Sequence, residues 1–239
     1  MLERTLEPEV MDTAQDAREY NRMDHSAVNV KFVDELLSFL ADQGKRLRIQ
    51  SDPLFDDLED QDVIGSLLDV GTGTALIPIE LCKRNPEVRV MAIDLAASML
   101  DLAIQNIDIA GLREQVQLGQ VDAKDSGYED GMFDAAISNS IIHHIPEPAR
   151  TVSEMIRTTR DGGVIFVRDL MRPGCSEEVD SLVRTYAGDE SEYSRRLFGE
   201  SLHASLTLDE MKQLVEQFGV SPETVTATSD RHWTWATVR

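Results

Sequence analysis

Short apolar runs alternate with helical patterns through the middle of this chain. The apolar runs are expected strands, at residues 67–70, 88–93, 116–121, 133–138 and 164–167. The helical patterns between them lie at about residues 74–84, 96–110 and 148–159, and Asp161-Gly162-Gly163 is expected as a turn before the last strand. Strands that alternate with helices in this way are joined by right-handed crossovers into a parallel, doubly wound sheet. The predicted fold class is therefore α/β.

Additional helices are expected outside this alternating region. Apolar residues recur at helical spacing from Ser26 to Gln43, and Gly44 follows as a helix stop. A second helical stripe runs from Val179 to Tyr186. Residues 207–210, Thr-Leu-Asp-Glu, have the form of a capping box that begins a further helix.

The end of the chain returns to strand-like alternation. Residues 225–228 and 232–236 alternate apolar and polar positions, which predicts two final strands that form a β-hairpin or an antiparallel edge pair. The sheet would then have about seven strands, mostly parallel, with the last one antiparallel. We divide the chain into a helical N-terminal extension or lid, residues 1–60, and a core domain, residues 61–239, with a helical insertion at about 171–219.

The first strand of the core leads into a glycine turn, Asp69-Val70-Gly71-Thr72-Gly73. Gly71 and Gly73 permit a backbone with positive φ and let a ligand approach closely. A helix follows the turn, so the N–H groups of its first residues would face that ligand. Dinucleotide-binding folds have a third small residue where this chain has Leu76. This departure disfavours a nicotinamide or flavin site.

Polar residues also follow the later strands, at the edge where open α/β sheets bind their ligands. Asp94 ends the second strand, 21 residues after Gly73. Its two carboxylate oxygens can accept hydrogen bonds from both hydroxyls of a ribose. Asp122-Ala123 follows the third strand, and Asn139 lies in the polar segment 138–146 after the fourth. An ordinary surface or loop role remains open for each acid.

Together these motifs resemble those of class I S-adenosylmethionine-dependent methyltransferases of the small-molecule, type 11-like kind. The resemblance covers roughly residues 60–170 and implies a Rossmann-like fold. It assigns the ribose to Asp94, the adenine to Asp122-Ala123 and the methionine part of the cofactor to Asn139. The expected cofactor-binding residues are Asp69, Gly71, Thr72, Gly73, Asp94, Leu95, Met99, Asp122, Ala123 and Asn139. For Leu95 and Met99, which would flank the adenine, a core role is the alternative.

His143 and His144 are the catalytic candidates, because an imidazole titrates near neutrality and can serve as a general base. A base is required only if the acceptor must lose a proton, and a structural histidine explains the sequence nearly as well. If the segment is extended, the two adjacent side chains point in opposite directions, and the pair is then not expected to share a metal ion. No other group of His, Cys and acidic residues has metal-ligand spacing, and no metal is expected.

The surrounding segment also bears on the substrate class. It lacks the Asn/Asp-Pro-Pro-Tyr/Phe sequence of enzymes that methylate adenine or glutamine amides, so those acceptors are disfavoured. Candidates for an acceptor pocket precede the N-terminal helix or follow the fifth strand, and the set is Tyr20, His25, Asp169, Arg172 and His203. Asp24 and Arg168 lie in the same regions. Trp233 and Trp235 share one face of the last strand and are interpreted as core.

Composition limits the partners. The chain has 44 acidic and 23 basic residues, a formal net charge of −21. Phosphate binding needs clustered Lys and Arg, so nucleic acid and an anionic membrane surface are disfavoured. No stretch approaches the ~20 apolar residues of a membrane span, and Cys82 and Cys175 do not suggest a disulfide framework. A cytoplasmic location and a small-molecule partner are expected, while the oligomeric state is left open.

The sequence therefore predicts methyl transfer from S-adenosylmethionine to a small molecule. The sulfonium is an activated methyl donor, so the protein must mainly hold the acceptor in line and exclude water. Two alternatives remain. One is a nucleotide-dependent oxidoreductase on a Rossmann fold, and the other is a non-catalytic S-adenosylmethionine-binding module.

Overall fold

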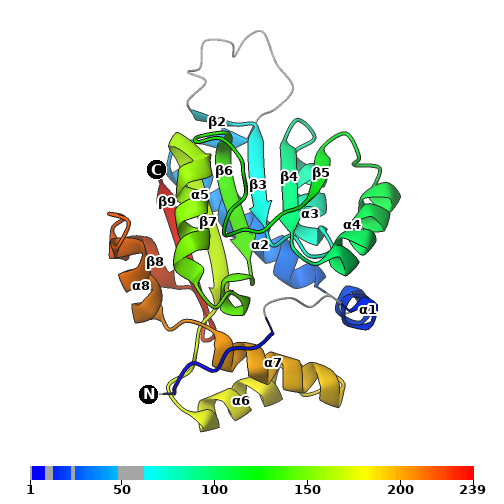
Figure 1. Cartoon of the computed structure of the whole chain (residues 1–239), viewed down its shortest axis with the longest axis vertical. Coiled ribbons are helices and arrows are strands. Elements are labelled where there is room, and N and C mark those ends of the chain that lie inside the picture. Colours follow the sequence, from blue (N-terminus) through cyan, green and yellow to red (C-terminus); the bar gives the residue numbers. More distant parts are fainter. Residues whose placement is uncertain (1, 9–12, 23–24, 48–61) are drawn as a thin grey trace. The chain divides into compact units, whose positions relative to one another are not determined.

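A computed structural model describes residues 2–8, 13–22, 25–47 and 62–239 (Figure 1). Asp24 and residues 48–61 lie outside the described residues. The α-helices are α1 (Ala14–Arg22), α2 (Ser26–Asp42), α3 (Leu76–Arg84), α4 (Ala97–Ala110), α5 (Pro148–Thr158), α6 (Ser176–Ala187), α7 (Glu192–Ala204) and α8 (Leu208–Glu216), and the 3₁₀ turns are η3 (Ile142–His144) and η4 (Pro222–Thr224). The strands are β1 (Arg46–Leu47), β2 (Val63–Ile64), β3 (Ser66–Val70), β4 (Arg89–Asp94), β5 (Val116–Gln120), β6 (Phe133–Asn139), β7 (Thr159–Leu170), β8 (Val225–Ala227) and β9 (His232–Val238).

Seven of the strands form one sheet, in the order β5-β4-β3-β6-β7-β9-β8. β3 pairs in parallel with β4 and with β6, and β4 pairs in parallel with β5. β8 and β9 are antiparallel. The strand order runs outward in both directions from β3 and β6, which confirms the doubly wound, mostly parallel sheet with an antiparallel end. Parallel sheets of this kind bind ligands at the carboxyl ends of the strands, near the point where the order reverses.

The internal contacts divide the chain into two compact units. Unit 1 comprises Met1–Val10, Ser140–Ala149 and Val167–Trp235. Unit 2 comprises Met11–Asn139, Arg150–Phe166 and Ala236–Arg239. Residues 1–60 therefore contribute to both units, and so do strands β7 and β9.

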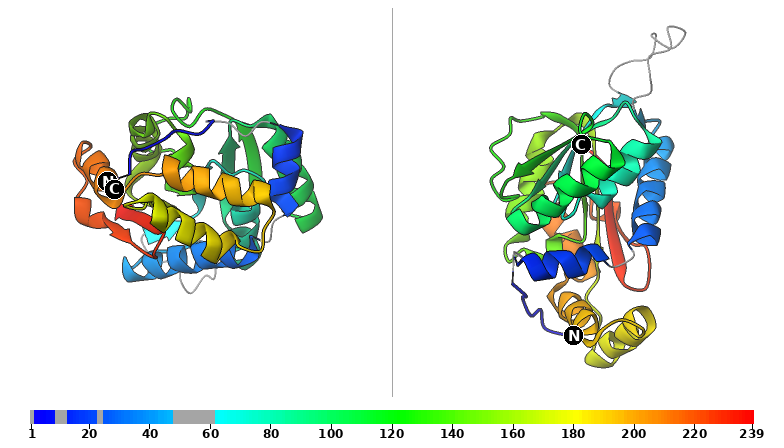
Figure 2. Two further views of the ribbon diagram at one scale, coloured as in Figure 1. Left: turned by 90° about the horizontal axis from the view of Figure 1, so that it is seen from below. Right: turned by 90° about the vertical axis from the view of Figure 1, so that its right-hand side faces the viewer.

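Unit 2 contains the largest hydrophobic core. Helix α2 places Phe32, Leu36 and Leu40 on one face, at the spacing of an amphipathic helix. All three are buried in a cluster that also includes Leu67 of β3 and Phe166 of β7. In Figure 2 the helices α2 and α5 lie on opposite sides of the strands, as the doubly wound fold requires.

Unit 1 has a core of its own. Helices α6 and α7 pack side by side (Figures 1 and 2), with Val179 and Leu202 buried between them. Leu2 of the N-terminal segment packs against the same cluster. Trp233 and Trp235 on β9 are completely buried, which confirms their interpretation as core residues.

Strand β7 is longer than predicted. It begins at Thr159 and includes Asp161-Gly162-Gly163, so the prediction of a turn before the strand is wrong. The Gly162 N–H donates to the Arg239 carbonyl at 2.8 Å, and the Arg239 N–H donates to the Gly163 carbonyl at 2.9 Å. Pairing with the end of the chain thus extends the strand through residues that locally favour a turn.

Two helices were absent from the prediction. Helix α1 lies in a stretch without a sustained apolar period, although Ala17 is buried and the helix packs against α4. Helix α7 begins after Ser191, whose side chain accepts the Ser194 N–H. Serine followed by an acidic residue, Glu192, is an N-cap signal that the sequence does offer.

Candidate functional site

The glycine turn joins β3 to α3. Gly71 and Gly73 have φ of +71° and +54°, so both positions require the left-handed conformation that glycine adopts without strain. The N–H groups of Gly71 and Thr72 each donate to the Ile93 carbonyl at 2.9 Å. These bonds hold the turn against the end of β4.

Asp94 at the end of β4 bonds directly to this turn. Its Oδ2 accepts the Gly73 N–H at 2.7 Å, and its Oδ1 accepts the Ala96 N–H at 2.9 Å. A carboxylate offers about four acceptor positions. The same two oxygens can therefore accept hydrogen bonds from a ligand while they fix the turn and the start of α4.

A small pocket in unit 2 lies beside the turn. It is lined by Asp69 of β3, Thr72, Asn139 of β6, Tyr20 of α1 and Asn29 of α2. Burial raises the pKa of Asp69 to about 7, and the nearby Asp94 carboxylate adds to this effect while a hydrogen bond from Thr72 opposes it. The pocket thus contains an acid whose ionisation a bound cation would favour.

Tyr20 and His25 come together at the same place. Their rings stack with centroids 4.3 Å apart, and the His25 Nε2 lies 2.8 Å from the Tyr20 carbonyl oxygen. Burial of the Tyr20 hydroxyl and the carboxylates of Asp94 and Asp69 raise the pKa of Tyr20. Both residues were predicted for an acceptor pocket, and the structure places Tyr20 beside the predicted cofactor residues. Asn29 was missed, because a single polar position on an amphipathic helix carries no distinguishing signal.

The predicted adenine residues follow β4 and β5. Asp122 accepts the Lys124 N–H at 2.9 Å and lies 3.1 Å from the Lys124 ammonium. Partial burial alone would raise the pKa of Asp122, but these contacts lower it, so the side chain is ionised at neutral pH. Leu95 is 39% exposed, whereas Met99 is buried on the inner face of α4. Ala123 is next to Asp122 in the same loop.

His143 and His144 lie in unit 1, in the 3₁₀ turn η3. Their ring centroids are 4.1 Å apart, with the ring planes inclined by 36°. The premise that the segment is extended is therefore wrong. A 3₁₀ turn has three residues per turn, so neighbouring side chains differ in direction by about 120° instead of 180°.

Asp169 fixes this histidine turn from β7. Its Oδ2 accepts the Ile142 N–H at 2.6 Å, and its Oδ1 accepts the Leu170 N–H at 2.6 Å. The His143 Nδ1 lies 2.5 Å from the same Oδ1. Burial alone would lower the pKa of His143, but the Asp169 carboxylate raises it. Asp169 was predicted for an acceptor pocket, and the structure shows it completely buried beneath η3.

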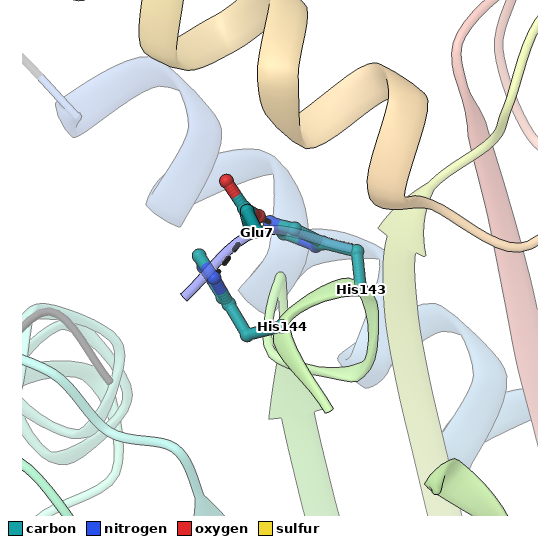
Figure 3. A group of neighbouring side chains, drawn as sticks. All are labelled: Glu7, His143 and His144. Atoms are coloured by element: carbon teal, nitrogen blue, oxygen red, sulfur yellow. Dashed lines mark ion pairs between the residues drawn. The ribbon is translucent and has the colours of Figure 1, made fainter. Parts of the chain in front are cut away.

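The N-terminal segment, residues 2–8, contacts the same turn. The Arg4 Nε donates to the Ala204 carbonyl at 2.6 Å, and its Nη2 donates to the Ile145 carbonyl at 3.1 Å. These bonds place Glu7 beside the two histidines, as Figure 3 shows. The Glu7 Oε1 lies 3.0 Å from the His144 Nδ1 and 3.6 Å from the His143 Nε2. The local sequence around Glu7 contains no pattern that predicts this contact.

Arg172 and His203 have other surroundings in unit 1. The buried Arg172 guanidinium donates to the carbonyls of Leu2 and Ser205 and to the Glu210 carboxylate, at 3.1, 2.7 and 2.5 Å. These contacts give Arg172 a structural role, and its role in binding an acceptor stays a prediction. His203 lies in a groove between α6 and α7. Among the described residues, His203 is not part of the cluster formed by Glu7, His143 and His144.

Comparison with known proteins identifies the family. Residues 68–167 match the family described as a methyltransferase domain. Phosphatidylethanolamine N-methyltransferase of Cereibacter sphaeroides is 30% identical over 163 residues, which are 66% of this chain and 75% of that protein. The chain belongs to the class I S-adenosylmethionine-dependent methyltransferases. Its cofactor is S-adenosylmethionine and its reaction is methyl transfer, as the sequence predicts.

Two further proteins show how far the similarity extends. Demethylmenaquinone methyltransferase of Desulfitobacterium hafniense is 28% identical over 109 residues, and the match covers 45% of this chain and 43% of that protein. The solved structure of a methyltransferase from Aquifex aeolicus, with 15% identity, has a TM-score of 0.62 over 94% of this chain and 97% of that one. This structural match supports the fold.

Membership of this family excludes the oxidoreductase alternative. The sequence at Leu76 agrees with this conclusion, because dinucleotide-binding sites have a small residue at that position. Within the described residues, no helix combines the length and the apolar character that crossing a membrane requires.

Proposed function

We propose that the pocket beside the glycine turn binds S-adenosylmethionine and that the enzyme methylates a small-molecule acceptor. The observation that carries this proposal is the carboxylate of Asp94, which bonds the Gly73 N–H and the Ala96 N–H at once. The bound sulfonium supplies an activated methyl group. The chain then has to bind the acceptor, orient it toward the methyl group and exclude water from the site.

The residues of unit 2 divide this binding task among them. Asp94 would accept hydrogen bonds from the ribose hydroxyls, and Asp122-Ala123 would contact the adenine. Asp69 would pair with the ammonium group of the methionine part. Burial disfavours the ionised form of Asp69, and a bound cation would favour it. Asn139 lines the same pocket and would bind the same end of the cofactor.

A small-molecule acceptor is supported by chemistry and by relatives. The net charge of −21 disfavours nucleic acid. Two of the relatives, a phosphatidylethanolamine and a demethylmenaquinone methyltransferase, are not named for a protein or nucleic-acid acceptor. A third, a release factor glutamine methyltransferase that is 40% identical over 96 residues, is named for a protein acceptor. The free cysteines Cys82 and Cys175 agree with a reducing, cytoplasmic location. His143 and His144 stay predicted candidates for removing a proton from an acceptor that must lose one, a role that the metal site proposed below would replace.

Calorimetric titration with S-adenosylmethionine, S-adenosylhomocysteine and NAD(H) in parallel tests the proposal. We expect Kd values on the order of micromolar for the first two and no heat of binding for the third. Binding of NAD(H) alone would overturn the proposal. Activity is then sought by transfer of a labelled methyl group to panels of small amines, phenols and quinols.

The affinity for S-adenosylmethionine is expected to rise with pH through about 7. Asp69, with a pKa of about 7, is mostly neutral at pH 6 and half ionised at pH 7. If the ammonium of the cofactor binds the ionised form, Kd should fall about fivefold between these pH values. Calorimetry across this range measures the slope. The Asp69→Asn variant should show a flat profile, and an equal slope in both proteins would assign the effect to another group.

A further inference from the structure

Glu7, His143 and His144 bring three metal-ligating atoms close together in unit 1 (Figure 3). The Glu7 Oε1 lies 3.0 Å from the His144 Nδ1 and 3.6 Å from the His143 Nε2, and all three atoms lie within 4.8 Å of one another. Zinc–ligand bonds of about 2.0–2.1 Å place the ligand atoms of a tetrahedral site about 3.3 Å apart. The distances of 3.0 and 3.6 Å fall on either side of that value.

Two of these atoms are buried without a hydrogen bond. Among the described residues, neither the Glu7 Oε1 nor the His144 Nδ1 has a hydrogen-bond partner, although the two face each other at 3.0 Å. At that distance the two groups form an ion pair when His144 is protonated. A cation bound between them would satisfy both.

His143 is oriented as metal-binding histidines commonly are. Its Nδ1 faces the Asp169 Oδ1 at 2.5 Å, and Asp169 is itself held by the N–H groups of Ile142 and Leu170. A proton on Nδ1 leaves the lone pair of Nε2 directed away from Asp169, on the side of Glu7. This is the carboxylate–histidine–metal arrangement in which an outer acid fixes the ring of a ligand.

The local charge also favours a cation. The carboxylates of Glu7 and Asp169 flank the two imidazoles. Arg4 is a nearby positive group that offsets part of this negative charge, and its guanidinium donates to the backbone carbonyls of Ala204, His143 and Ile145. A shared proton is the competing occupant, and the experiment below distinguishes it from a metal ion.

We propose that Glu7, His143 and His144 bind a divalent transition-metal ion of the zinc class, with Asp169 orienting His143. Two imidazoles and one carboxylate form a known ligand set for zinc, and three protein ligands leave a fourth position for water or another oxygen. Magnesium and calcium prefer oxygen ligands throughout and are disfavoured. Because Glu7 belongs to residues 2–8, the ion would also tie this segment to η3. The proposal does not depend on the cofactor site of unit 2.

Cobalt(II) binding tests the site, because tetrahedral cobalt absorbs visible light and replaces zinc readily. The full chain, stripped of metal with a chelator and free of any affinity tag, should take up one Co²⁺ per chain with strong visible absorption. Added Zn²⁺ should abolish that absorption. Glu7→Gln and His144→Ala should each weaken Co²⁺ binding at least tenfold, and Asp169→Asn should weaken it about 10- to 100-fold.

Glu3→Gln provides a matched control, since Glu3 is an exposed acid of the same segment. It should bind Co²⁺ like the unmodified protein, and circular dichroism should show that all variants are folded. A folded protein that takes up no Co²⁺ would overturn the proposal. So would Co²⁺ binding that Glu7→Gln and His144→Ala leave unchanged. S-adenosylmethionine titrations of the same samples keep the two proposals apart, because cofactor binding without metal binding would reject only the metal site.

Discussion

The Asp94→Ala variant should bind S-adenosylmethionine about 5- to 150-fold more weakly than the unmodified enzyme. This range corresponds to about 1–3 kcal/mol, the scale of losing hydrogen bonds to a charged group. The carboxylate also accepts the N–H groups of Gly73 and Ala96, at 2.7 and 2.9 Å. Its removal therefore takes away the expected ribose ligand and loosens the turn that faces the cofactor.

Two measurements separate these effects. Calorimetry with S-adenosylmethionine and S-adenosylhomocysteine gives the change in affinity, and thermal unfolding without ligand gives the change in the stability of the protein. Asp101→Ala is the matched control, because Asp101 is an exposed acid on the following helix α4. Affinity that Asp94→Ala leaves unchanged would remove Asp94 from the site.

The central strands could be predicted because their signals are local. The apolar runs that became β3 and β4 are nearly continuous, as buried parallel strands are, and each ends at an acid or a glycine turn. The extension of β7 could not be predicted in this way. Gly162 and Gly163 pair with Arg239, the last residue of the chain, and no local pattern encodes so distant a partner.

The site residues also divide into those that a local pattern predicts and those that distant contacts position. Asp94 could be located because a strand end and a glycine turn fix its position, and the bond to Gly73 agrees with that reasoning. Glu7 could not be placed beside His143 and His144, since hydrogen bonds far along the chain, from Arg4 to Ala204 and Ile145, set its position.

Asp169 illustrates why residue type and strand position are not enough. Its place after the apolar run of the fifth strand suggested an acid that faces a ligand. In the structure Asp169 is completely buried. Its carboxylate accepts the N–H group of Ile142 in η3 and the N–H group of Leu170 on β7. An acid at a strand end can equally serve as an internal cap for a neighbouring turn, and the choice depends on what packs over it.

The Asp169→Ala variant should accordingly lose about 3–5 kcal/mol of its free energy of unfolding, the cost of removing one partner of a buried ion pair. The substitution leaves the N–H groups of Ile142 and Leu170 and the His143 ring without their acceptor in a buried place. Urea unfolding measures the loss. Asp161→Ala, at a position on the same strand where the side chain is 98% exposed, should change stability by less than about 0.5 kcal/mol. If Asp169→Ala were as mild as that control, water must replace the carboxylate, and Asp169 would not be what holds His143 in place.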